Sequence, residues 1–181
     1  TIVHIARPAK YLLLPIQEGS KEGQVKLETG SPADTEMDIR LAIDSVEYYV
    51  PFALTQSEGC ATVTIRNVAA DALCWDSIKV SDTFDTTNRD KFRPLYHHTP
   101  LYGWMNDANG LVYKDGEYHL YFQHNPYGSM WGNMHWGHSV SKDLVHWEHL
   151  DPAIARDTLG HIFSGSAIVD KNNSAGYGED T

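Results

Sequence analysis

The sequence of 181 residues has few cysteines, no basic cluster and no long apolar run. Cys60 and Cys74 could form one disulfide bridge or remain two buried thiols, but two cysteines cannot build a disulfide framework. The net charge of −10 argues against nucleic acid or an anionic membrane as a partner, because either would be repelled. No stretch approaches the roughly 20 consecutive apolar residues that a membrane-spanning helix needs.

Hydrophobic residues make up 41% of the chain, which is enough to form a core and excludes a mainly disordered protein. Histidine and tryptophan are scarce before residue 90, where only one of ten His and one of five Trp occur. The segment 81–90 is polar and rich in turn-forming residues, as linkers are. We therefore predict an N-terminal domain at 1–90 and a second domain at 91–181.

The N-terminal domain shows short segments in which apolar and polar residues alternate, separated by turn-forming residues. Seven such segments and no convincing helical window predict a β-sandwich. Pro51 should then lie on an edge strand or at a bulge, because proline cannot donate to a strand ladder. The predicted strands are 2–5, 11–14, 24–27, 37–41, 48–52, 61–65 and 73–78.

The second domain also has the pattern of an all-β fold. Asp115-Gly116 separates two strand-like segments and is a strong hairpin signal. Four antiparallel strands are predicted, at 110–113, 117–123, 135–140 and 144–147, which is the size of one blade of a β-propeller. A fifth strand at 161–169 would start a second blade. Since a propeller needs about four to eight blades, we expect the chain to hold only the beginning of one.

The segment 93–110 is unusually dense in residues that can do chemistry. In it, Asp107 lies between two asparagines and immediately precedes a predicted strand. Carboxylates and amides can hydrogen-bond sugar hydroxyls, while aromatic rings cover the C–H faces of a sugar ring. The segment therefore suits a neutral polyhydroxylated ligand. The alternative is that Asp107 only forms an Asx turn at the start of a strand.

Ordered motifs in the second domain resemble the family 32 glycoside hydrolases, which are β-fructofuranosidases such as invertases, inulinases and levanases. The first motif, Trp104-Met105-Asn106-Asp107-Ala108-Asn109-Gly110, is similar to the nucleophile motif of that family. The resemblance continues through the segments 118–126, 131–138, 141–147 and 163–166. It covers residues 91–181, and some bacterial members of the family carry an additional N-terminal domain.

The resemblance implies a five-bladed β-propeller that cleaves levan, inulin or sucrose by a retaining mechanism. It also implies a secreted, periplasmic or cell-surface location, a carbohydrate substrate, no cofactor and contact with the rest of the propeller. By motif, Asp107 would be the nucleophile. The residues that would bind the fructosyl unit are Asn106, Gln123, Trp131, Phe163 and Ser164.

Two departures from the family pattern bear on activity. Ala108 stands where the family usually has proline, so packing must hold Asp107 in place. The Arg-Asp-Pro and Glu-Cys motifs that supply two further acids are absent, since Arg156-Asp157 is followed by Thr158 and precedes Phe163. We therefore expect the 181-residue chain alone to be inactive. The alternative function is a non-catalytic carbohydrate-binding protein.

Two pairs of histidines, His135/His138 and His146/His149, have a spacing that could suggest a metal site. On strands, however, an offset of three residues points side chains to opposite faces. Zinc sites need three or four converging ligands. We therefore expect no metal.

Overall fold

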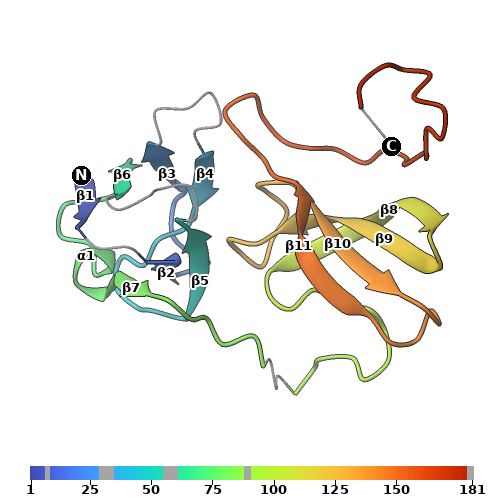
Figure 1. Ribbon diagram of the computed structural model, residues 1–181. Helices are drawn as coiled ribbons and strands as arrows, with labels where there is room; N and C mark the ends of the chain where they lie inside the picture. Colours follow the sequence, from blue (N-terminus) through green and yellow to red (C-terminus); the bar gives the residue numbers. More distant parts are fainter. Residues whose placement is uncertain (7–8, 29–34, 55–60, 88–90, 179–181) are drawn as a thin grey trace.

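The computed structural model describes residues 1–6, 9–28, 35–54, 61–87 and 91–178 (Figure 1). The chain is all-β, as expected, and its strands form three antiparallel sheets. Within the described ranges, the one helix is the four-residue α1 (Cys74–Ser77). No helix there is long and apolar enough to cross a membrane.

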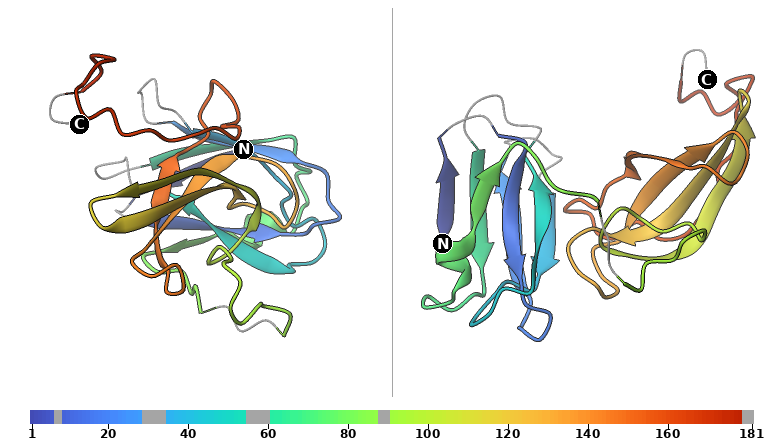
Figure 2. Two further views of the ribbon diagram at one scale, coloured as in Figure 1. Left: turned by 90° about the vertical axis from the view of Figure 1, so that its right-hand side faces the viewer. Right: turned by 90° about the horizontal axis from the view of Figure 1, so that it is seen from below.

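Two of the sheets pack face to face and confirm the predicted β-sandwich (Figure 2). The first has the order β1-β6-β3-β4, with bounds Ile2–Ile5, Ala61–Arg66, Gly23–Glu28 and Thr35–Ile39. The second has the order β5-β2-β7, with bounds Tyr48–Ala53, Tyr11–Ile16 and Lys79–Ser81. Pro51 lies in β5 at the edge of its sheet, as predicted.

Alternation along the strands explains the core between these two sheets. In β3 and β6, every second residue is buried, so Val25 and Leu27 point inward with Val63 and Ile65. Phe52 on β5 is fully buried on the opposite sheet. Each strand places its apolar side chains on one side of its sheet. The apolar faces of the two sheets therefore meet and exclude water from a single continuous cluster.

One predicted strand of the sandwich is wrong. Residues 73–78 form α1 followed by an extended residue, and the backbone N–H of Ile78 donates to the carbonyl of Cys74 at 3.0 Å. Six residues are too few to distinguish a period of two from a helical period. Cys74 is a buried free thiol, and Cys60 lies outside the described residues.

The third sheet lies in the second half of the chain and has the order β11-β10-β9-β8. Its strands are β8 (Trp104–Lys114), β9 (Glu117–Asn125), β10 (His135–Ser141) and β11 (Glu148–Ile154). Asp115 and Gly116 have φ values of 53° and 89° and connect β8 to β9, which confirms the hairpin. The sheet has the four antiparallel strands expected of one blade.

The fourth strand of this sheet does not lie where the sequence predicts it. Residues 144–147 form a turn because Ser141 Oγ and Asp143 Oδ1 accept the backbone N–H groups that follow them, at 2.8–3.2 Å. Leu144 has a φ of 65°, which a strand cannot accommodate. The strand therefore starts only at Glu148, and Pro152 lies on this edge strand.

The predicted fifth strand at 161–169 is also wrong as a strand. This segment makes single backbone hydrogen bonds rather than a ladder. Ile162 N–H donates to the Met134 carbonyl at 3.0 Å, and Gly110 N–H donates to the Gly165 carbonyl at 3.1 Å. The second contact ties the segment to β8.

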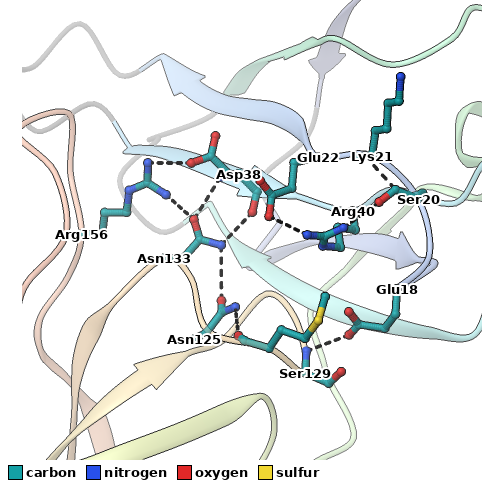
Figure 3. A network of polar contacts seen from close by, with 11 residues as sticks. Glu18, Ser20, Lys21, Glu22, Asp38, Arg40, Asn125, Ser129, Asn133 and Arg156 are labelled. Carbon is teal, nitrogen blue, oxygen red and sulfur yellow. Dashed lines mark hydrogen bonds and ion pairs between the residues drawn. The ribbon is translucent and has the colours of Figure 1, made fainter.

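A partly buried polar network joins the third sheet to the sandwich (Figure 3). Asn133 accepts the Asp38 backbone N–H at 3.0 Å and donates to the Asp38 carbonyl at 2.7 Å. Arg156 pairs with the Asp38 carboxylate at 2.9 Å. Tyr127 packs in the sandwich core with its ring 5.6 Å from that of Phe52. The two halves therefore meet through specific contacts.

Candidate active site

Asp107 lies in a bulge of strand β8. Asn106 pairs with Gln123 and Ala108 pairs with Phe122, so Asp107 is the extra residue between two consecutive partners on β9. Bulges bend a strand and redirect a side chain, and they are common beside active sites. The sequence places Asp107 before a strand, whereas the structure places it inside one, with its side chain exposed.

A second irregularity follows on the same strand. The pairing shifts again between Asn109 and Val112, and Gly110 has a φ of 57° between them. A Cβ atom at Gly110 would come within 2.8 Å of the Tyr121 ring and 3.0 Å of the Trp136 ring. Glycine is therefore required here by conformation and by space.

The segment 163–165 brings Ser164 to Asp107. Ser164 Oγ donates to Asp107 Oδ2 at 2.9 Å, across 57 residues of sequence. The indole N–H of Trp136 donates to the Phe163 carbonyl at 2.9 Å and holds the segment over the sheet. A long-range contact of this kind is not part of an Asx turn, which is a local structure.

Asn106 and Gln123 are directly paired across β8 and β9, so their side chains share one face of the sheet. Gln123 is 3% exposed, and its Nε2 has no hydrogen-bond partner among the described residues. The amide nitrogen and oxygen of the buried Asn109 side chain also have no hydrogen-bond partner among the described residues. A buried amide without a partner is costly and calls for an explanation such as a ligand.

Three aromatic rings form a row beside this face. The rings of Phe163 and His161 are 6.0 Å apart, and those of His161 and Trp131 are stacked at 5.3 Å. Trp131 and Phe163 remain 55% and 64% exposed, so their surfaces are open to a ligand. Sequence analysis missed His161, although its position two residues before Phe163 places both on one side of an extended segment.

Three of the other histidines, His98, His135 and His146, differ in their surroundings. Burial, reinforced by neighbouring charges, lowers the pKa of His98 to about 4, and burial also lowers the pKa of His135 to about 4. His146 instead pairs with Asp143 at 2.7 Å in the turn before β11. Within the described ranges no group of three His, Cys, Asp or Glu residues could hold a metal ion.

Comparison with protein families divides the chain in two. Residues 97–177 match the glycosyl hydrolases family 32 N-terminal domain, and residues 1–96 match a domain of unknown function, DUF4980. A levanase from Bacillus subtilis (strain 168) is 59% identical over 98 residues, which are 54% of this chain and 14% of the levanase. An extracellular exo-inulinase from Aspergillus awamori is 49% identical over 94 residues, or 49% of this chain and 18% of that protein.

Among solved structures, the exo-inulinase from Aspergillus awamori is similar with a TM-score of 0.47 and 46% identity. The match covers 54% of this chain and 19% of that one. The chain thus corresponds to less than a fifth of the length of these relatives. All of the site residues named above lie within the stretch that matches the hydrolase domain.

Proposed function

Residues 97–177 of this chain belong to the N-terminal domain of the glycosyl hydrolases family 32 and residues 1–96 to DUF4980, and from this premise we propose that the protein hydrolyses β-fructofuranosidic bonds of levan, inulin or sucrose. The observation that carries the proposal is the exposed carboxylate of Asp107, aimed by a bulge and held by Ser164. The proposed mechanism is retaining.

Asp107 acts as the nucleophile. The hydrogen bond from Ser164 occupies Oδ2 and leaves Oδ1 to attack the anomeric carbon of a terminal fructosyl unit. The bond to the leaving oxygen breaks as the bond to Oδ1 forms, and the leaving oxygen takes a proton from a second acid. Water then attacks the fructosyl-enzyme, gives up a proton to that second group and restores Asp107.

The other site residues bind the fructosyl unit. Asn106 and Gln123 lie side by side on one face, and the unpaired Nε2 of Gln123 can donate to a sugar hydroxyl. Trp131 and Phe163 offer open aromatic surfaces for the C–H faces of the ring, and Ser164 adds a hydroxyl beside Asp107. These groups are neutral, which suits a neutral sugar.

A retaining glycosidase needs a second carboxyl group roughly 5–5.5 Å from the nucleophile. Residues 1–181 contain neither a Glu-Cys nor an Arg-Asp-Pro motif to supply it. We therefore propose that residues 1–181 do not hydrolyse fructans by themselves and act together with further propeller blades. Two relatives are described as extracellular exo-inulinases, which supports a secreted, periplasmic or cell-surface location.

The test uses the product of the complete reading frame that encodes residues 1–181. Asp107→Asn keeps the size of the side chain but removes the attacking anion, so kcat should fall about 10³-fold or more with little change in Tm. Asp115→Asn is the matched control, since Asp115 lies exposed in the β8–β9 turn. Its kcat should equal that of the wild type.

Two outcomes would contradict the proposal. A folded Asp107→Asn protein that turns over within tenfold of the wild type would remove Asp107 as the nucleophile. A wild-type protein that binds fructans without hydrolysing them would favour the non-catalytic carbohydrate-binding function instead.

A further inference from the structure

A cavity of about 200 Å³ lies where the sandwich meets the third sheet. One wall comes from the sandwich and includes Glu22 and Arg40, and the opposite wall includes Gly128, Trp131 and His161. Its volume is below the roughly 300–1,000 Å³ of pockets that hold drug-sized ligands. The cavity is thus suited to a small ligand, such as a single sugar unit.

The aromatic row connects this cavity to the candidate active site. Trp131 and His161 line the cavity, and Phe163 continues the row to Ser164, which contacts Asp107. Burial and then the charge of Arg156 lower the pKa of His161, so its ring is neutral near pH 7. A row of neutral aromatic rings is a surface on which successive sugar rings can lie.

The sandwich supplies the polar groups that a sugar needs. Glu22 accepts a hydrogen bond from Arg40 at 3.1 Å, and their side chains remain 54% and 33% exposed. Carboxylate oxygens accept from hydroxyls and guanidinium groups donate to them, so the pair offers both functions on one wall. Because Glu18 and Asp38 also line the cavity, an anionic ligand would be repelled.

Hydrogen bonds hold both walls of the cavity in place, which favours a binding site over a gap left by imperfect packing. The side chain of Asn133 is 3% exposed and hydrogen-bonds both backbone groups of Asp38, which connects the two walls (Figure 3). Glu18 accepts the Ser129 N–H at 2.7 Å and fixes the loop next to Trp131. A preformed site does not lose binding free energy in ordering its own residues.

We propose that this cavity binds a fructosyl unit of the substrate chain beyond the one held at Asp107, so that the N-terminal domain raises the preference for longer fructans. The inference rests on the proposed function, because it takes the substrate to be a chain of fructosyl units. The N-terminal domain is then a part of the substrate site rather than a separate module.

The experiment compares a fructo-oligosaccharide with sucrose as substrates of the product of the complete reading frame. Glu22→Ala removes the hydrogen-bond acceptor, and Gly128→Leu fills the cavity from the opposite wall. Each should lower kcat/KM for the oligosaccharide about three- to tenfold, with a much smaller change for sucrose, which has no second fructosyl unit. Glu28→Ala is the control, because Glu28 is an exposed carboxylate at the other end of β3. It should leave the ratio of the two kcat/KM values unchanged.

The outcomes separate this inference from the proposed function. If the wild type hydrolyses both substrates but neither variant changes the ratio of the two kcat/KM values, the inference is wrong and the proposed function stands. Equal losses on both substrates would also overturn it, since they would place the cavity at the first fructosyl unit or in the support of the fold. A wild type that hydrolyses neither substrate would overturn both proposals.

Discussion

The sandwich and the third sheet differ in what they bury. Among the described residues, the sandwich half buries 18 apolar residues and one polar residue, whereas residues 91–178 bury five apolar and eight polar residues. Conversely, 16 of the 19 exposed large hydrophobic side chains belong to the second half. The sandwich is thus held by apolar packing, and the third sheet is held largely by hydrogen bonds and ring contacts.

The difference means that the main apolar contribution to stability and the candidate active site lie in different halves of the chain. Burying apolar area is the main favourable contribution to folding, so the sandwich can fold with few polar contacts inside. Buried amides and imidazoles are costly unless they are paired, and unpaired ones such as Gln123 Nε2 are expected where a ligand binds. The candidate active site lies in the half that bears this cost.

The largest effect on folding should follow from a change in the sandwich core. Phe52 is fully buried and contacts Tyr127, whereas Phe163 is 64% exposed. Phe52→Ala should therefore lower the free energy of unfolding by about 3–5 kcal/mol, because it removes buried surface and leaves a cavity. Phe163→Ala should change it by less than about 1 kcal/mol. Urea denaturation of both variants measures the difference. Equal losses in the free energy of unfolding would contradict the proposed difference between the two halves.

A smaller effect should appear on acidification, and it should arise in the third sheet. Burial lowers the pKa of His135 from 6.5 to about 4 in the folded protein, so the unfolded chain binds the proton first as the pH falls. Above pH 6.5 this residue does not lower the free energy of unfolding. As the pH falls from 6.5 toward 4, His135 lowers that free energy by about 2–3 kcal/mol.

Unfolding measured at several pH values on His135→Gln and His4→Gln tests this expectation. His135→Gln should make the dependence of stability on pH between about 6.5 and 4 less steep, because one titrating group is gone while the partly buried His98 remains. His4→Gln, an exposed position in the sandwich, should keep the steep dependence. A flat curve for the wild type would show that His135 is not held neutral by burial.

The smallest effect concerns the hairpin between β8 and β9. Gly116 has a φ of 89°, and a Cβ atom there would meet only open space, so Gly116→Ala should cost about 1 kcal/mol through backbone strain alone. Gly19→Ala is the matched control, since Gly19 has equally open surroundings without a positive φ. Thermal melts of the two variants should differ by a few degrees.

Sequence patterns predicted the elements whose signal is local. Alternation indicated six strands of the sandwich, and Asp115-Gly116 indicated the hairpin. The strand expected at 144–147 failed because the side chains of Ser141 and Asp143 extend the turn, which a hydrophobic pattern does not reveal. At the site, the motif pointed to Asp107, but the bulge depends on register with β9, and the contact with Ser164 depends on a distant segment. The cavity could not be predicted, since its walls come from both halves.

The most direct test of the account is to look for the fructosyl group on Asp107. The product of the complete reading frame is mixed with sucrose, and the reaction is quenched with acid during turnover. The protein is then digested, and the masses of its peptides are measured by mass spectrometry. A retaining mechanism predicts one fructosyl residue on the peptide that contains Asp107, and no such adduct in Asp107→Asn. A fructosyl group on a different carboxylate, or a first-formed product of inverted configuration with no adduct, would contradict the account.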